Sequence, residues 1–246
     1  MPVNAPRRFL SIFAAGGFAA CGIVANAAVI EPVDDLRISI GVLAGGKAKE
    51  RVSENGSTKA FDWERGSYLR HPAMRTEVGW WQARDSARLD SWHGMWTARL
   101  SYTHQDITPT GYTIGGVTTD NGRPDLKLGF DQYGVAFGYG IATTPHDTDL
   151  GDVHYELLPL LRGGYATSDT TSTGADPEIV RGHGLWWEAA LETAVVVQSD
   201  SWVVDLHGGA GYGRYHAKTD MPNNGTSALT IITLAPEIGL SVGWRF

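Results

Sequence analysis

Apolar and polar residues alternate along most of the chain, from about residue 36 to the last residue. A period of two is the signature of β-strands, because successive side chains of a strand point to opposite faces of the sheet. A helical period does not extend over any segment of helix length. The alternation predicts eight strands, which cover residues 36–50, 72–84, 91–105, 127–142, 152–167, 184–198, 201–217 and 229–246.

Each predicted strand has one apolar face and one face of small or polar residues. In the last strand the apolar face runs from Ile232 to Phe246, and the opposite face carries Glu237, Gly239 and Ser241. A soluble β-sandwich has strands with the same two faces, so the alternation alone leaves both architectures open.

Connection lengths and aromatic positions favour a transmembrane barrel. Ser199-Asp200 reads as a two-residue turn, and alternate connections are longer and polar, as in barrels with short periplasmic turns and long outer loops. Aromatic residues fall near both ends of the strands, as expected for two membrane interfaces. The short connections lie near 85–90, 143–151 and 199–200, and the long ones near 51–71, 106–126, 168–183 and 218–228.

The N-terminus has the order of features typical of a secretory signal peptide. Arg7 and Arg8 precede the apolar stretch Phe9–Ala20, and Ala25-Asn26-Ala27 forms a small-residue cleavage site. We therefore predict a signal peptide over residues 1–27 and one barrel domain over residues 28–246.

The only cysteine, Cys21, lies inside the predicted signal peptide. Cleavage after Ala27 would leave a mature chain without disulfides or thiolate metal ligands. The alternative is a lipoprotein anchored at Cys21, because residues 18–21 loosely resemble a lipobox.

The composition narrows the function classes further. The net charge of -7 argues against nucleic-acid binding, which normally requires a basic surface. No apolar run after the N-terminus approaches the roughly 20 residues of a spanning helix. The residue pattern indicates neither a cofactor nor a metal ion.

The C-terminus ends in an alternating strand that includes Trp244 and finishes on Phe246. This ending resembles the signal by which the barrel-assembly machinery recognises its substrates during insertion. With these features, residues 36–246 resemble the small eight-stranded outer-membrane proteins, such as the OmpA transmembrane domain and OmpX. The resemblance is architectural and carries no family-specific motif, so no residue role follows from it.

This resemblance implies an all-β fold, an up-and-down antiparallel transmembrane β-barrel of the bacterial outer membrane, present as a monomer among outer-membrane lipids. Ten strands is the alternative if residues 106–126 contribute a hairpin.

The interior of an eight-stranded barrel is just wide enough for side chains to fill it, so inward-pointing charges are expected to pair. A two-residue turn at Ser199-Asp200 would place Glu192 opposite His207. The predicted interior charge network consists of Glu77, Arg99, Arg162, Glu188, Glu192, Asp205, His207 and Glu237.

Two further pairings in this network follow less directly from the predicted turns. The 85–90 turn would place Glu77 opposite Arg99, and Arg162 is expected to reach Glu188 or Glu192. We interpret the network as a plug that makes the barrel rigid. The alternative is a narrow gated pore with Glu192 and His207 as its switch.

Basic residues mark the point where the seventh strand leaves the membrane. Arg214, His216 and Lys218 are expected to contact lipopolysaccharide phosphates, although ordinary anchoring of basic side chains at the interface gives the same pattern. We predict a structural or surface-interaction role rather than an enzyme, with outer loops that could also bind an extracellular ligand.

An outer-membrane enzyme that acts on lipid is the alternative function. It would need a nucleophile, a base and an orienting carboxylate within hydrogen-bond reach. The candidate residues for such a site, or for a loop-borne protease site, are His104, Asp106, His216, His71, His183 and Asp169.

Overall fold

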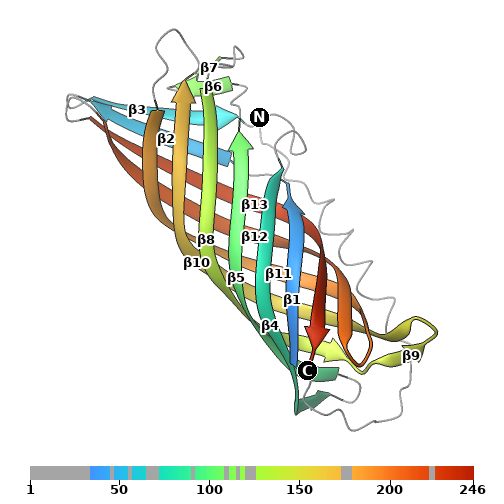
Figure 1. Cartoon of the computed structure of the whole chain (residues 1–246). Coiled ribbons are helices and arrows are strands. Elements are labelled where there is room, and N and C mark those ends of the chain that lie inside the picture. The colour runs from blue at the N-terminus through green and yellow to red at the C-terminus, as the bar shows by residue number, and fades with distance from the viewer. Residues whose placement is uncertain are drawn as a thin grey trace, which may run out of the picture.

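The computed structural model describes residues 34–44, 47–54, 57–64, 72–89, 92–107, 111–114, 117–119, 126–172, 179–221 and 225–246 (Figure 1). The predicted signal peptide and Cys21 lie outside these residues and remain predictions. Within the described ranges, no helix is long and apolar enough to cross a membrane.

The regular structure in the described residues is entirely β-strand. The strands are β1 Asp34–Leu43, β2 Lys47–Glu54, β3 Ser57–Glu64, β4 Ala73–Leu89, β5 Trp92–Ile107, β6 Gly111–Ile114, β7 Val117–Thr119, β8 Leu126–Thr143, β9 His146–Thr148, β10 Gly151–Ser172, β11 Ile179–Gln198, β12 Trp202–Met221 and β13 Gly225–Arg245.

Eight of these strands close into a ring. The order is β1-β4-β5-β8-β10-β11-β12-β13, and β13 pairs back with β1, so that every strand of the ring has two antiparallel neighbours. This ring confirms the predicted eight-stranded barrel. A hairpin does form within residues 106–126, from β6 and β7, but β6 pairs with β3 outside the ring and adds no strand to it.

The strands continue well beyond the predicted segments at the long-loop end. β10 and β11 stay paired up to Thr171 and Ile179, and β12 and β13 up to Met221 and Gly225. Small polar residues dominate these extensions, so the apolar alternation disappears while the backbone hydrogen bonds persist. The predicted long loops are therefore partly paired strand, and the loop residues that remain between them lie outside the described ranges.

The first predicted strand is divided into β1 and β2, which both pair with β13. The register changes between Leu43↔Glu237 and Lys47↔Ile232, so that four residues of β13 oppose three of the first strand. Pro236 lies in this interval and has no N–H to donate, although its carbonyl accepts a hydrogen bond of 3.0 Å from the Ala44 N–H.

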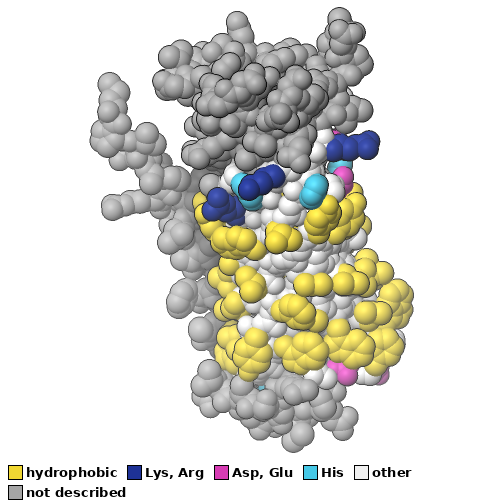
Figure 2. Space-filling model, turned by 90° about the vertical axis from the view of Figure 1, so that its left-hand side faces the viewer, with side chains coloured by type: hydrophobic (Ala, Val, Ile, Leu, Met, Phe, Trp, Pro, Cys, Tyr) yellow, Lys and Arg dark blue, Asp and Glu magenta, His cyan; other side chains and the backbone are white. Residues whose placement is uncertain are grey.

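The barrel presents apolar side chains outward and polar side chains inward, the reverse of a soluble protein. On β1, Ile38, Ile40 and Val42 are exposed, whereas Arg37 and Ser39 are buried. Figure 2 shows exposed apolar side chains as a band across the face of the barrel that it views. We call this band the apolar belt.

Aromatic side chains mark both margins of the apolar belt. Trp80 stacks on Phe246 at the short-turn end, with ring centroids 6.4 Å apart, and Trp187 packs on Tyr212 toward the long-loop end at 5.8 Å. A closed barrel with this belt is a transmembrane barrel of the outer-membrane type, which confirms the fold and the location predicted from the sequence. In such barrels the short turns face the periplasm, so we call the two ends the periplasmic end and the outer end.

Candidate functional site

Charged side chains meet in the middle of the barrel. Arg162 is 1% exposed, and its guanidinium lies 3.0 Å from Glu77 Oε1 and 2.7 Å from Glu188 Oε1. Arg99 donates to Glu77 and to both oxygens of Glu192. The central charge cluster, as we call it, consists of Arg75, Arg99, Arg162, Glu77, Glu188, Glu192 and Glu237.

The central charge cluster has three positive and four negative formal charges, and its members come from strands on all sides of the ring. Arg75 on β4, for example, reaches Glu188 on β11 at 2.8 Å and Glu237 on β13 at 2.7 Å. Buried charges are costly unless they are paired and hydrogen-bonded, and these pairs span the lumen. The interior is therefore cross-linked at this level.

A second group of charges lies nearer the periplasmic end. Arg37 binds Glu156 with both terminal guanidinium nitrogens, at 2.7 and 3.2 Å, and also contacts Asp35 and Asp205. The ring of His207 hydrogen-bonds Asp205 at 2.8 Å. We define the periplasmic charge cluster as Asp35, Arg37, His154, Glu156, Asp205 and His207.

Apolar side chains from β4, β5, β8 and β10 lie between the two clusters on one side of the lumen. Trp81, Met95, Ala142, Leu158 and Leu160 pack together as buried residues. The guanidinium carbons of Arg37 and Arg99 lie 4.9 and 4.3 Å from the Trp81 ring centroid, so this indole contacts one arginine of each cluster.

The outer part of the interior is aromatic. The rings of Phe130 and Tyr215 meet edge to face at 5.7 Å, and both side chains are buried. Trp186 is also buried and donates from its indole N–H to the Tyr133 carbonyl at 3.2 Å. In the described part of the chain, charged, apolar and aromatic side chains thus occupy successive levels of the lumen.

Inward-facing glycines make room for the charged side chains. A Cβ at Gly79 would lie 2.6 Å from Arg99 Cγ, and one at Gly211 would lie 3.0 Å from the Glu188 carboxylate. The Gly-rich inner faces of the strands are thus complementary in volume to the charges opposite them.

Two of the predicted cross-strand pairings are wrong in register. Glu192 lies opposite Gly209, and His207 lies opposite Ala194. The two-residue turn is Asp200-Ser201, closed by a hydrogen bond of 2.9 Å from the Ser199 N–H to the Trp202 carbonyl, and a turn that lies one residue later shifts each partner by two residues. Glu192 instead binds Arg99, and His207 binds Asp205. Glu192 and His207 are therefore not the directly opposed pair that the pore hypothesis assumed, although the charge of Glu192 still acts on His207.

Glu77 likewise lies opposite Ser101, not opposite Arg99, which faces Gly79. A shift of two residues keeps a side chain on the same face, so Arg99 still reaches Glu77 diagonally, at 2.9 Å. Arg162 lies directly opposite Glu188.

The sequence analysis missed several interior residues, notably Arg37, Arg75, Asp35 and His154. Each continues the alternation of a strand whose inner face was already assigned, for example Arg75 two residues from Glu77. The period of two was therefore the signal that could have identified them.

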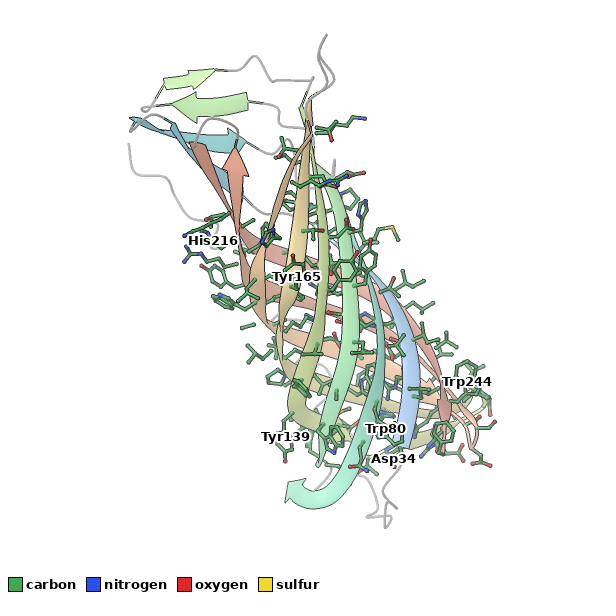
Figure 3. All side chains as sticks on the ribbon, turned by 60° about the vertical axis from the view of Figure 1, so that its left-hand side comes forward. Asp34, Trp80, Tyr139, Tyr165, His216 and Trp244 are labelled. Atoms are coloured by element: carbon green, nitrogen blue, oxygen red, sulfur yellow. The ribbon has the colours of Figure 1, made fainter. Side chains whose placement is uncertain are left out.

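Basic side chains line the outer margin of the apolar belt on β12. Arg214, His216 and Lys218 are exposed at alternate positions, and they lie opposite Trp187, Leu185 and His183 of β11. The His216 ring lies 3.0 Å from the Thr230 hydroxyl. Figure 2 shows basic side chains just beyond the apolar belt, and Figure 3 shows His216 and Tyr165 toward the outer end. We call Arg214, His216 and Lys218 the basic rim.

An acidic group with one histidine lies at the outer margin on β5 and β8. The apolar belt ends there at Tyr102 and Tyr133, and His104 and Asp131 lie beyond it. Asp131 Oδ1 lies 2.9 Å from His104 Nδ1 and accepts a hydrogen bond of 2.6 Å from the Tyr102 hydroxyl. His104 Nε2 lies 3.6 Å from Asp106.

These contacts set the charge of the histidine. The hydrogen bond to Asp131 raises the pKa of the His104 imidazole above its usual value. Partial burial opposes ionisation of Asp131, but hydrogen bonds from Tyr102 and His104 outweigh it and lower the pKa of that carboxyl group. The geometry thus favours an imidazolium between two carboxylates.

The C-terminus lies at the periplasmic end (Figure 1). Phe246 donates its N–H to the Asp34 carbonyl at 2.9 Å, which attaches the end of the chain to the first strand. The side chains of Trp244 and Phe246 are both exposed, as expected for the margin of the apolar belt. Among the described residues, no group of three or more His, Cys, Asp or Glu side chains could hold a metal ion.

No protein-family model matches the sequence, and no curated protein matches it either. Among solved structures, the outer membrane protease OmpT from Escherichia coli is similar, with 11% identity over 90% of this chain and 99% of that chain and a TM-score of 0.44. Ail of Yersinia pestis, in complex with the heparin analogue sucrose octasulfate, has 14% identity over 88% of this chain and 100% of that chain, with a TM-score of 0.33. OprG from Pseudomonas aeruginosa has 9% identity over 87% of this chain and 95% of that chain, with a TM-score of 0.37. At these levels of similarity, none of the three indicates what this chain binds or does.

Proposed function

We propose that this protein is a non-enzymatic outer-membrane barrel that acts through its outer surface, by contact with the phosphates of lipopolysaccharide. The observation that carries the proposal is the basic rim, three exposed basic residues at alternate positions of one strand just beyond the apolar belt. Lipid phosphates lie at this level of the membrane, and arginine and lysine pair well with them. The side chains that occupy the interior also support a surface role, because they leave little room for a pore through the barrel.

Binding of lipid A by the refolded protein in detergent tests this proposal. Lipid A with both phosphates is expected to bind more tightly than the dephosphorylated molecule. Replacement of Arg214 and Lys218 by Gln should weaken binding about tenfold or more for each side chain that pairs with a phosphate, because a charge-assisted hydrogen bond contributes roughly 1.5–3 kcal/mol.

Lys127→Gln is the matched control, since Lys127 is an exposed lysine at the outer end of β8, away from β12. Equal affinity for both forms of lipid A, or equal losses of affinity in the basic-rim variant and the control, would exclude the basic rim as the binding site.

The alternative of a lipid-acting enzyme depends on His104, which has the carboxylate neighbour that a catalytic base requires. However, a general base needs a free lone pair, and His104 Nε2 faces Asp106. The raised pKa also favours the protonated ring. The geometry therefore supports an ion cluster at the membrane margin better than a base. Release of fatty acid from phospholipid or lipid A by the wild-type protein, abolished in His104→Ala, would reverse this conclusion.

We further propose that the barrel-assembly machinery recognises Trp244 and Phe246 during insertion. Their exposed side chains on the closing strand support this role, because an unpaired β13 would present them before the ring closes. Truncation of Phe246 should slow assembly into proteoliposomes that contain the machinery, and it should leave spontaneous folding into detergent unchanged. An equal effect on both would contradict the proposal.

A further inference from the structure

The basic rim extends along the outside of β12, away from the apolar belt. Arg214, His216 and Lys218 lie at alternate positions of the strand, and all three are exposed. Arg214 lies opposite Trp187 and two residues from Tyr212, the aromatic pair that marks this margin of the apolar belt. The basic rim therefore begins at the membrane margin and continues outward from it.

The basic rim is longer than a headgroup layer is deep. Successive residues of a strand are about 3.3 Å apart, so about 13 Å separate the Cα atoms of Arg214 and Lys218. Barrel strands tilt by about 35–45°, which gives a rise of about 10 Å along the membrane normal. The headgroup layer on each side of a bilayer is only about 5–8 Å deep. A single level of lipid phosphate accounts for Arg214 but not for the whole basic rim.

The strands beside the basic rim place no carboxylate opposite it. The facing residues are Trp187, Leu185 and His183 on β11, and Ile232, Thr230 and Ala228 on β13. Within the described ranges, neither Arg214 nor Lys218 forms an ion pair, whereas Arg181 on β11 lies 3.6 Å from Asp169. Both levels of the basic rim therefore offer an unpaired positive charge to an anionic ligand.

The opposite wall of the barrel has the reverse charge. β5 is four strands away from β12 in either direction around the ring. Asp106 on β5 and Asp131 on β8 flank His104 there, so two carboxylates outnumber one imidazole. Carboxylates repel a phosphorylated lipid and basic side chains attract it. The charge distribution therefore directs such a lipid to the β12 side of the barrel.

We propose that the basic rim binds one lipopolysaccharide molecule at two levels, with a lipid A phosphate at Arg214 and a second anionic group, on the core sugars, at Lys218. This inference rests on the proposed function and specifies which lipid the site prefers. A glycerophospholipid with one phosphate offers negative charge at one level only. His216 lies between the two levels, and its Nδ1 is 3.0 Å from the Thr230 hydroxyl, which leaves Nε2 for the same ligand.

The test compares lipid A that carries both phosphates with a rough-type lipopolysaccharide that has a phosphorylated core, each bound to the refolded protein in detergent. The wild-type protein should bind the lipopolysaccharide about tenfold or more tightly, because it makes one further charge-assisted contact. Lys218→Gln should bring the ratio of the two dissociation constants close to one. Arg214→Gln should weaken binding of both ligands and preserve the ratio. Lys127→Gln, at the outer end of β8, is the matched control and should change neither affinity.

A lipopolysaccharide whose core sugars lack phosphate identifies the second anionic group. If it binds only as tightly as lipid A, the group at Lys218 is a core phosphate. If it keeps the tighter binding, the group is a sugar carboxylate, and Lys218→Gln should abolish that preference as well.

Equal affinity of the wild-type protein for the two ligands, or a preference that persists in Lys218→Gln, would overturn the inference and leave contact with lipid A in place. Equal affinity for lipid A with and without its phosphates would instead exclude the proposed function itself. Migration of each unboiled variant on a gel, compared with that of the wild-type protein, checks that the barrel has folded.

Discussion

Replacement of Arg162 by Met tests the central charge cluster at its most connected residue. The substitution keeps an unbranched side chain but removes the guanidinium group with its charge and its hydrogen bonds. Arg162 contacts Glu77, Glu188 and Glu192 at 3.0, 2.7 and 3.4 Å, and lies 3.6 Å from Glu237. Without it, two arginines would face four carboxylates. Loss of one partner from a buried ion pair costs about 3–5 kcal/mol, and we expect a loss of that size in the free energy of unfolding.

Urea unfolding of the refolded protein in detergent or lipid vesicles measures this loss, with the fluorescence of the 9 tryptophans as the signal. A second substitution, Glu188→Gln, removes one of the carboxylates left in excess. The double variant should therefore be more stable than the sum of the two single effects predicts, with a coupling energy of roughly 1–3 kcal/mol.

Arg214→Met is the matched control, because it removes an arginine from the outer surface, and it should change the free energy of unfolding by no more than about 0.5 kcal/mol. If Arg162→Met unfolds with the same free energy as the wild-type protein, the ion pairs of Arg162 contribute nothing to the stability of the barrel. Additive effects in the double variant would mean that Arg162 and Glu188 do not share an interaction.

Three further predictions concern other parts of the barrel. Gly211→Ala should lower the free energy of unfolding by about 1–3 kcal/mol because its Cβ would meet the Glu188 carboxylate at 3.0 Å, whereas Gly208→Ala, whose nearest contact is 3.6 Å, should have little effect. The NMR titration of His104 should give a pKa above the usual 6.5, and Asp131→Asn should lower it; any stability from this pair is present between the lowered pKa of Asp131 and the raised pKa of His104, and is lost as the pH falls below the first or rises above the second. On a gel, unboiled protein in detergent should migrate differently from boiled protein, and equal migration together with solubility without detergent would contradict a transmembrane barrel.

The sequence was sufficient to predict the barrel because the side chains of β1, β5, β8 and β12 alternate between lipid and lumen. That alternation identifies which face a residue is on, so Glu77, Glu188 and Glu237 could be assigned to the interior. It could not give the register, which depends on turn geometry. The turn after Gln198 is Asp200-Ser201, one residue later than predicted, and this shift placed Gly209 instead of His207 opposite Glu192.

The contacts that join the periplasmic charge cluster across the lumen could not be predicted for a related reason. Its contacts join residues far apart in sequence, such as Arg37 with Glu156 and Asp205, across the lumen rather than between neighbouring strands. Which inward side chains meet across a barrel depends on the tilt and stagger of the whole ring. Single-strand patterns contain no information on that stagger.

A planar-bilayer recording tests the central claim, that the lumen is filled and the protein acts at its surface. The layers around Trp81, Arg162 and Phe130 predict no steady current through the wild-type protein between about pH 5 and 8. A stable ohmic conductance in that range, reproduced with independently refolded protein, would show an open path through the barrel and would contradict the account.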